Sequence, residues 1–132
     1  MFYYKGYTTK EISNILNKNE VKLINNNKVY NTLYDYNYLN KKDKYNFCLG
    51  GNYPLLKIES NKKDKKEILI IKDSFANSFI PFLTDNYTDI HIIDLRFYNK
   101  SVSEYIKSNE IKEILFLYSI SSLNESNLEN IR

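Results

Sequence analysis

The residues best placed to do chemistry are Asp73 and Ser74, at the end of the stretch KEILIIKDSF. Four aliphatic residues precede this pair, and an apolar pattern with helical spacing follows at once. A serine at the carboxyl end of a buried strand can act as a nucleophile, because the unpaired N–H groups of the next helix could hold an oxyanion. The same serine could simply cap that helix by accepting from the N–H of residue 76 or 77. The local pattern leaves both interpretations open for Ser74, whereas helix capping is the expected role of Asp73.

A serine nucleophile needs a base within hydrogen-bond reach. The single histidine, His91, lies inside the apolar stretch IHIIDL. Alternation along a strand places His91 opposite Ile90 and Ile92 and away from the strand end. We therefore expect His91 to be structural, and no other side chain obviously supplies the base.

Two further polar groups could support such a site. Asp94 and Arg96 follow the second aliphatic stretch, where we expect an ion pair between them and hold anion binding as the alternative. The segment Gly50-Gly51-Asn52 could supply a second oxyanion donor, although a plain turn also explains these residues.

Composition excludes several classes of protein. The chain has 132 residues and a net charge of +3, from 19 basic and 16 acidic residues, which is too balanced to suggest a nucleic-acid partner. Its one cysteine, Cys48, cannot build a disulfide framework or a thiolate zinc site. No apolar run approaches the roughly 20 residues of a membrane span, and the N-terminus lacks the pattern of an export signal. We expect no cofactor and no metal.

The apolar patterns divide the chain into two parts of one domain, residues 1–132. Residues 1–53 are predicted to be an irregular lead-in, with a short helix capped near Thr8 and short strands or irregular segments from residue 21. Residues 54–132 are predicted to carry the regular elements. We expect strands at 55–58, 67–72, 90–95 and 114–118, and helices at 74–83, at 101–109 and from Ser121 onward.

This alternation of strands and helices favours parallel strands joined by right-handed crossovers. The predicted fold is therefore α/β, with a three-layer, mostly parallel sheet. In such sheets functional groups gather beyond the carboxyl ends of the strands, where Ser74, Asp94 and Ser119 fall.

The run ILIIKDSFANSFIPFL, followed by YTDIHIIDLRFY and IKEILFLYS, resembles the C-terminal half of the DHHW family. The upstream DKYNFCLGGNYPLLKI resembles the segment that precedes the serine strand there, so the resemblance extends over residues 28–120. The family comprises bacterial proteins related to extracytoplasmic O-acetyltransferases that modify alginate and other cell-surface polysaccharides. The resemblance implies an SGNH-hydrolase-like, flavodoxin-like fold that is incomplete on its N-terminal side.

The resemblance also implies roles for individual residues. Ser74 corresponds to the nucleophile that carries an acetyl group, Asp73 precedes it in the motif, and Asn77 and Arg96 match positions that line or support the site. A polysaccharide acceptor and a membrane-bound O-acyltransferase are the implied partners, and the cell envelope is the implied location.

One departure from the family pattern bears on activity. The family takes its acid and base from an Asp-His-His-Trp motif before the serine, but this chain has no histidine before Ser74 and no tryptophan anywhere. General-base assistance contributes about 10²–10⁴-fold, so we expect little activity from the chain alone and a missing N-terminal half as its partner. The alternatives are a non-catalytic remnant, a carbohydrate-binding module and a receiver-like domain, although Asp73 and Asp94 lack the acidic cluster that receivers need.

Overall fold

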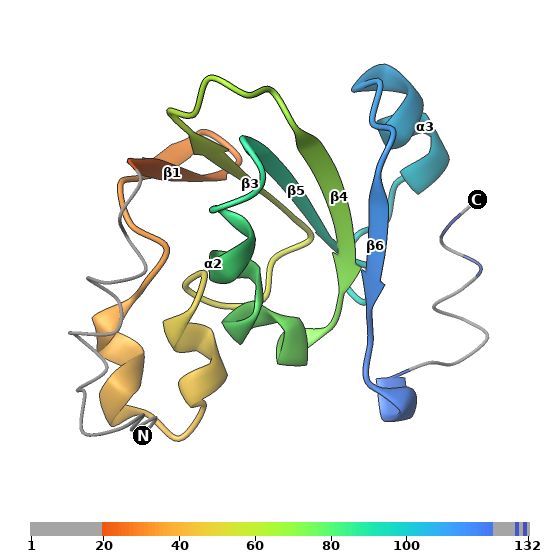
Figure 1. The fold of residues 1–132 in the computed structure, drawn as a ribbon. Helices are drawn as coiled ribbons and strands as arrows, with labels where there is room; N and C mark the ends of the chain where they lie inside the picture. The colour runs from red at the N-terminus through yellow and green to blue at the C-terminus, as the bar shows by residue number, and fades with distance from the viewer. Residues whose placement is uncertain (1–19, 123–128, 130, 132) are drawn as a thin grey trace.

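A six-stranded sheet in the order β2-β1-β3-β5-β4-β6 forms the centre of the described part of the chain (Figure 1). The computed structural model describes residues 20–122, 129 and 131. The strands are β1 (Val21–Asn25), β2 (Lys28–Tyr30), β3 (Leu55–Ser60), β4 (Glu67–Lys72), β5 (Asp89–Asp94) and β6 (Ile114–Leu117). The 3-10 helices are η1 (Tyr36–Asn40), η2 (Lys44–Phe47), η3 (Ser74–Ser78) and η4 (Ile120–Ser122), and the α-helices are α2 (Ile80–Leu83) and α3 (Val102–Ser108).

The three strands predicted from aliphatic runs in the second half are confirmed. β4 pairs in parallel with β5 on one side and with β6 on the other. Ile68 to Ile71 are all buried, as expected for a strand that is covered on both faces. The carboxyl ends of these strands therefore meet at one edge of the sheet.

The predicted three-layer, mostly parallel, SGNH-hydrolase-like or flavodoxin-like sheet is wrong. Three of the five strand pairings are antiparallel, namely β1 with β2, β1 with β3 and β3 with β5. The helices are also few and short, with four residues in α2 and seven in α3. The sheet is therefore mixed.

The antiparallel strands come from the part of the chain with the weakest pattern. β1 and β2 form a hairpin around Asn26 and Asn27, and Asn26 has the positive φ of 51° that such tight turns require. In β3 the residues Leu56 and Ile58 are buried while their neighbours are half-buried. Such alternation predicts a strand but says nothing about the direction in which it pairs.

Each face of β4 packs against a different hydrophobic cluster. Ile68 and Ile70 belong to one cluster with Ile80 of α2, and Leu69 and Ile71 belong to the other with Val102 of α3. In Figure 1, η3 and α2 accordingly lie on one side of β4 and α3 lies on the other. Both clusters thus hold β4, and with it the turn that carries Ser74.

The predicted helix over 74–83 is two shorter pieces, η3 and α2. Pro81 lies in the first turn of α2 and has no N–H to donate to the carbonyl of residue 77, which prevents one continuous α-helix. The apolar spacing did not indicate burial either, because Phe75, Phe79 and Phe82 are 57%, 46% and 50% exposed.

The remaining points concern the cap of α3, the two ends of the chain, the domain bounds and membrane spans. Ser101 caps α3 by accepting from the N–H of Glu104 at 3.2 Å. The helices expected near Thr8 and in most of the tail after Ser121 lie outside the described residues. The extent of the domain, and its division at residue 53, stay predictions. Within the described part of the chain, none of the helices has the length and apolar character needed to cross a bilayer.

Candidate functional site

Ser74 lies directly after β4, as the first residue of η3, and is half-buried. The cap of η3 is Asp73, whose Oδ1 accepts from the N–H of Phe75 at 3.0 Å. The Ser74 hydroxyl makes no hydrogen bond to any other described residue. The capping alternative therefore applies to Asp73, and the Ser74 hydroxyl is left available for another purpose.

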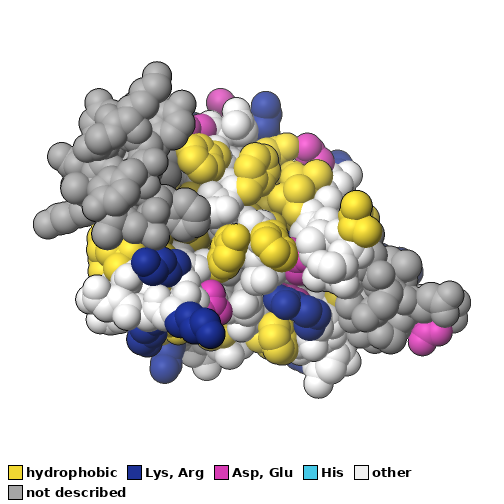
Figure 2. Space-filling model, turned by 90° about the horizontal axis from the view of Figure 1, so that it is seen from below, with side chains coloured by type: hydrophobic (Ala, Val, Ile, Leu, Met, Phe, Trp, Pro, Cys, Tyr) yellow, Lys and Arg dark blue, Asp and Glu magenta, His cyan; other side chains and the backbone are white. Residues whose placement is uncertain are grey.

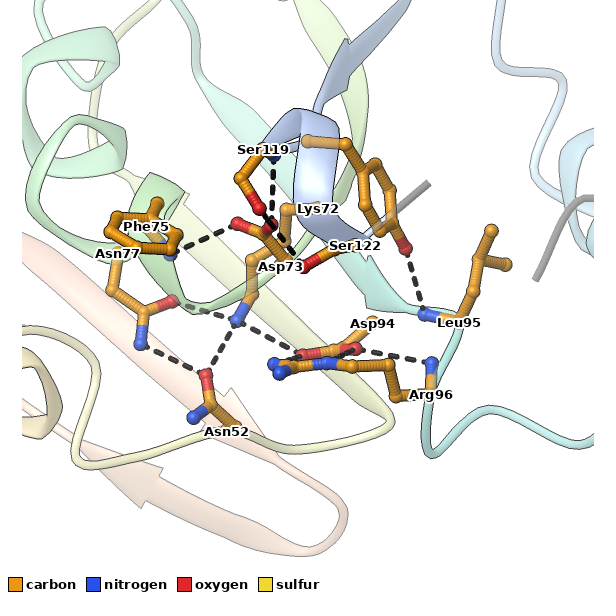
Figure 3. A network of polar contacts seen from close by, with 11 residues as sticks. Asn52, Lys72, Asp73, Phe75, Asn77, Asp94, Leu95, Arg96, Ser119 and Ser122 are labelled. Carbon is orange, nitrogen blue, oxygen red and sulfur yellow. Dashed lines mark hydrogen bonds and ion pairs between the residues drawn. The ribbon is translucent and has the colours of Figure 1, made fainter. Parts of the chain in front are cut away.

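Asp73 also joins the ends of β4 and β6. Its Oδ2 accepts from the backbone N–H of Ser119 at 2.8 Å and from the Ser119 hydroxyl at 2.7 Å (Figure 3). Burial by itself would raise the pKa of Asp73, but the hydrogen bonds from Ser119, Ser122 and Phe75 outweigh it and hold the pKa below its usual value. A charged Asp73 thus fixes the turn on which Ser74 lies.

The backbone donors expected around Ser74 are largely occupied. The N–H of Phe75 binds the Asp73 carboxylate, and the N–H of Ala76 donates to the Asp73 carbonyl at 3.3 Å. An oxyanion at Ser74 would therefore depend on other donors as well.

A fully buried lysine lies at the centre of the network drawn in Figure 3. Lys72, the last residue of β4, is 0% exposed. Its Nζ donates to Asn77 Oδ1 at 2.7 Å and to Asn52 Oδ1 at 3.2 Å, and lies 3.6 Å from Asp94 Oδ2. Burial lowers the pKa of Lys72 to about 8, although the nearby Asp94 charge opposes this shift.

Lys72 brings together two residues that the sequence had singled out separately. Asn77 Nδ2 donates to Asn52 Oδ1 at 3.1 Å, across 25 positions of sequence. Sequence reasoning missed Lys72 itself. The available signal was a charged residue that closes an aliphatic strand expected to be covered on both faces.

The predicted ion pair between Asp94 and Arg96 is confirmed. Arg96 Nε and NH2 donate to the two carboxylate oxygens at 2.9 and 2.6 Å, and the Arg96 backbone N–H donates to Oδ1 at 3.1 Å. Because Asp94 also faces Lys72, its carboxylate lies between two cations. Arg96 is thus connected to the network through Asp94.

His91 lies apart from this network. It is 2% exposed, pairs in register with Leu69, and so points into the cluster on the α3 side of the sheet. Its Nδ1 is 2.7 Å from the Tyr105 hydroxyl, and burial lowers the pKa of the ring. The structure therefore does not bring the imidazole of this chain to Ser74.

The surface at the carboxyl ends of β4 and β6 is rich in apolar side chains. Figure 2, which views the molecule from below Figure 1, shows hydrophobic side chains spread across this face among Lys, Arg, Asp and Glu. The exposed Phe75 and Phe79 follow Ser74 in sequence. The ring of Tyr45 contacts Phe75 edge-on, with 5.4 Å between the ring centroids. A cavity of about 210 Å³ lies elsewhere, between Leu23, Tyr34 and Tyr53, and Ser74 does not line it.

No group of three His, Cys, Asp or Glu side chains that could hold a metal ion occurs within the described ranges. What the arrangement offers chemically is a hydroxyl at a strand end, two positions after the lysine of a largely buried network that also contains two amides and a carboxylate.

The family model described as "DHHW protein" matches residues 3–93, which include β4 and Ser74. The chain belongs to the DHHW family. The match begins further toward the N-terminus than the resemblance in the sequence analysis and ends before Asp94, so Arg96 and Ser119 lie beyond it. No curated protein matches the chain.

Solved structures share the fold of this chain. A DHHW family protein from Eubacterium siraeum DSM 15702 is similar with a TM-score of 0.67 and 23% identity, over 86% of this chain and 39% of that one. Bacillus cereus PatB1 with a sulfonyl adduct has a TM-score of 0.66 and 30% identity, over 85% of this chain and 39% of that one. A second PatB1 structure has a TM-score of 0.62 and the same identity. The chain thus corresponds to 39% of the length of the first two relatives.

Proposed function

We propose that this chain is the serine-bearing part of a DHHW protein that transfers acetyl groups to cell-surface polysaccharide. Ser74 Oγ attacks the acetyl carbonyl of a donor, loses its proton to a base and forms an acetyl ester as the donor's leaving group departs. A sugar hydroxyl then attacks that ester and regenerates the serine. The observation that carries the proposal is the Ser74 hydroxyl at the carboxyl edge of the sheet, which makes no hydrogen bond to the residues that the structure describes because Asp73 caps the turn.

The PatB1 relative supports a nucleophile in this family. Its structure contains a sulfonyl adduct, and sulfonyl compounds are electrophiles that activated side chains attack. The strand and turn of Ser74 lie within the residues that the family model matches. We propose Ser74 as the corresponding reactive group of this chain.

The base belongs to a second polypeptide segment in this proposal. His91 points to the opposite side of the sheet, so we assign the base to an Asp-His-His-Trp motif supplied by another part of a DHHW protein. The proposal also places the reaction outside the cytoplasm, with a membrane-bound O-acyltransferase as the acetyl source.

The first prediction concerns Ser74 directly. Phenylmethylsulfonyl fluoride should add one sulfonyl group to the chain slowly, because no imidazole assists the serine. The adduct, measured by intact mass and peptide mapping, should be absent from Ser74→Ala and unchanged in Ser78→Ala. Ser78 is the matched control because it is an exposed serine of the same 3-10 helix.

Ester hydrolysis provides the second measurement. The chain alone should cleave a chromogenic acetyl ester near the background rate, and adding the motif-bearing part of a DHHW protein should raise a Ser74-dependent rate by roughly 10²-fold or more. An adduct on another residue would refute the role of Ser74. Rapid turnover by the chain alone would refute the missing base.

A further inference from the structure

The proposed function leaves Lys72 without a role, although it is the most unusual residue of the site. An ammonium removed from water costs several kcal/mol unless it is paired and hydrogen-bonded. Here the ammonium makes two hydrogen bonds, to Asn52 and Asn77, and an ion pair with Asp94 at 3.6 Å. Below its pKa of about 8 this lysine is a cation whose donors point to these partners, so it is not placed to take a proton from Ser74.

The ammonium dictates the orientation of both amides. A lysine side chain has donors only, so Asn52 and Asn77 must each turn an oxygen toward it. Either amide in the reverse orientation would place an NH2 group against the ammonium. With Asn77 fixed, its Nδ2 donates to Asn52 Oδ1, which accepts two hydrogen bonds. The Asn52 Nδ2 then points away from Lys72 and has no acceptor within the described part of the chain.

Two features relate this amide to Ser74. Ser74 and Asn77 are three positions apart in η3, and side chains at that spacing eclipse one another in a 3-10 helix. Asn52 is hydrogen-bonded to Asn77 and is only half-buried. The nearby N–H groups of Phe75 and Ala76 are occupied, so Asn52 Nδ2 is a polar donor that remains to be used.

We propose that Lys72 is a positioning residue, which fixes the Asn52 and Asn77 amides so that Asn52 Nδ2 is presented to the oxyanion that forms at Ser74. The claim that Asn52 Nδ2 binds an oxyanion at Ser74 rests on the proposed function. The claim that Lys72 fixes the orientation of both amides is independent of that function and can be tested separately. Oxyanion donors contribute about 10²–10³-fold to catalysis, so the arrangement has a measurable effect.

The orientation is tested by NMR on the unmodified chain. Hydrogen exchange of the Asn77 side-chain NH2 should be at least tenfold slower than that of the Asn52 NH2, because one is bonded inside the network and the other is open. Equal exchange rates would overturn the proposal without recourse to any variant.

Variants then test the part played by Lys72. In Lys72→Met the side-chain amide signals of both asparagines should move and their exchange rates should converge. Lys57→Met is the matched control, because Lys57 is also ion-paired, to Glu59 at 2.9 Å and Asp89 at 3.6 Å, but lies on β3 outside the network. Lys72→Gln, which can still donate to both oxygens, should retain slow exchange at Asn77. Unchanged amide signals in Lys72→Met, or equal changes in Lys57→Met, would overturn the proposal.

The presentation of Nδ2 is tested by sulfonylation of Ser74 with phenylmethylsulfonyl fluoride. Asn52→Asp keeps the oxygen acceptors and removes the donor, so the rate should fall at least tenfold. Lys72→Met should cause a similar fall, and Lys57→Met should stay within twofold. A rate in Asn52→Asp equal to that of the unmodified chain would overturn this step. Failure of Ser74 to react even with the motif-bearing part of a DHHW protein added would refute the proposed function instead, and the exchange measurements would still decide the role of Lys72.

Discussion

Lys72 carries a charge into a strand whose preceding four residues are aliphatic and buried. Replacing such a buried ion by an apolar residue of similar size is often neutral or stabilising. A lysine at this position therefore needs a reason other than stability, and the orientation of two amides provides one. The free-energy cost of burying this ammonium should be visible as a pH dependence of the free energy of unfolding.

The prediction for Lys72 follows from its pKa of about 8 in the folded state, against about 10.5 in the unfolded chain. The unfolded state binds more protons between these two values, so the free energy of unfolding should rise with pH across that interval. Relative to Lys72→Met, the unmodified chain should gain about 2 kcal/mol between pH 7 and pH 10. Urea unfolding at several pH values measures this difference, and a flat difference would contradict the burial of a charged lysine.

At the scale of single residues, the sequence predicted which residues lie at the sheet edge better than it predicted which residues they contact. Residues that end strands at one sheet edge could be listed in advance, which is how Ser74, Asp94 and Ser119 were found. The link between Asn52 and Asn77 could not, because nothing local indicates which distant amide meets a given lysine. The spacing of Phe75, Phe79 and Phe82 predicted a helix but did not indicate that all three rings are exposed.

Among the elements, the turn between β4 and η3 is the one that places Ser74. Asp73 satisfies three donors there, the N–H of Phe75 and both the N–H and the hydroxyl of Ser119. Its replacement would remove the partner of both backbone N–H groups in a part of the structure where Asp73 itself is fully buried, whereas the Ser119 hydroxyl would keep its contact with the Ser122 hydroxyl at 2.9 Å.

We predict that Asp73→Ala lowers the free energy of unfolding by about 2–3 kcal/mol, from the lost cap and the orphaned donors. Asp43→Ala is the matched control, because Asp43 precedes η2 but makes no capping hydrogen bond, and its effect should stay below about 0.5 kcal/mol. The pKa of Asp73 is lowered, so the difference should be full at neutral pH and decline as the pH falls below about 4. Equal effects of the two substitutions would contradict this account of the turn.

The strands themselves were predictable where both faces are covered. Continuous aliphatic runs indicated β4, β5 and β6 with boundaries close to those observed. The direction in which β3 pairs with β5 was not predictable, because backbone hydrogen bonds can form in either direction and the choice depends on how the connecting segments run. Here the pairing is antiparallel, which makes the sheet mixed.

On the scale of the whole molecule, β4 contributes side chains to both hydrophobic clusters. Ile70 faces the α2 side and Ile71 faces the α3 side, and both are 0% exposed. Loss of packing on either side should therefore weaken the same strand and spread to the entire fold.

We predict that Ile70→Ala and Ile71→Ala each destabilise the chain by about 2–5 kcal/mol, with one unfolding transition in each case. Val29→Ala is the control, because Val29 is 57% exposed in β2, and it should change stability by less than about 0.5 kcal/mol. Circular dichroism and tyrosine fluorescence measure backbone and side-chain unfolding. Transitions that separate in either core variant would show that the two clusters unfold independently.

The bond from Asp73 to Ser119 spans 46 positions of sequence. During synthesis the carboxylate emerges from the ribosome well before its hydroxyl and amide donors do. The turn that carries Ser74 can therefore reach its final shape only after β6 has been made and has docked, so a nascent or shortened polypeptide that already contains the serine would still lack the contacts that hold this turn.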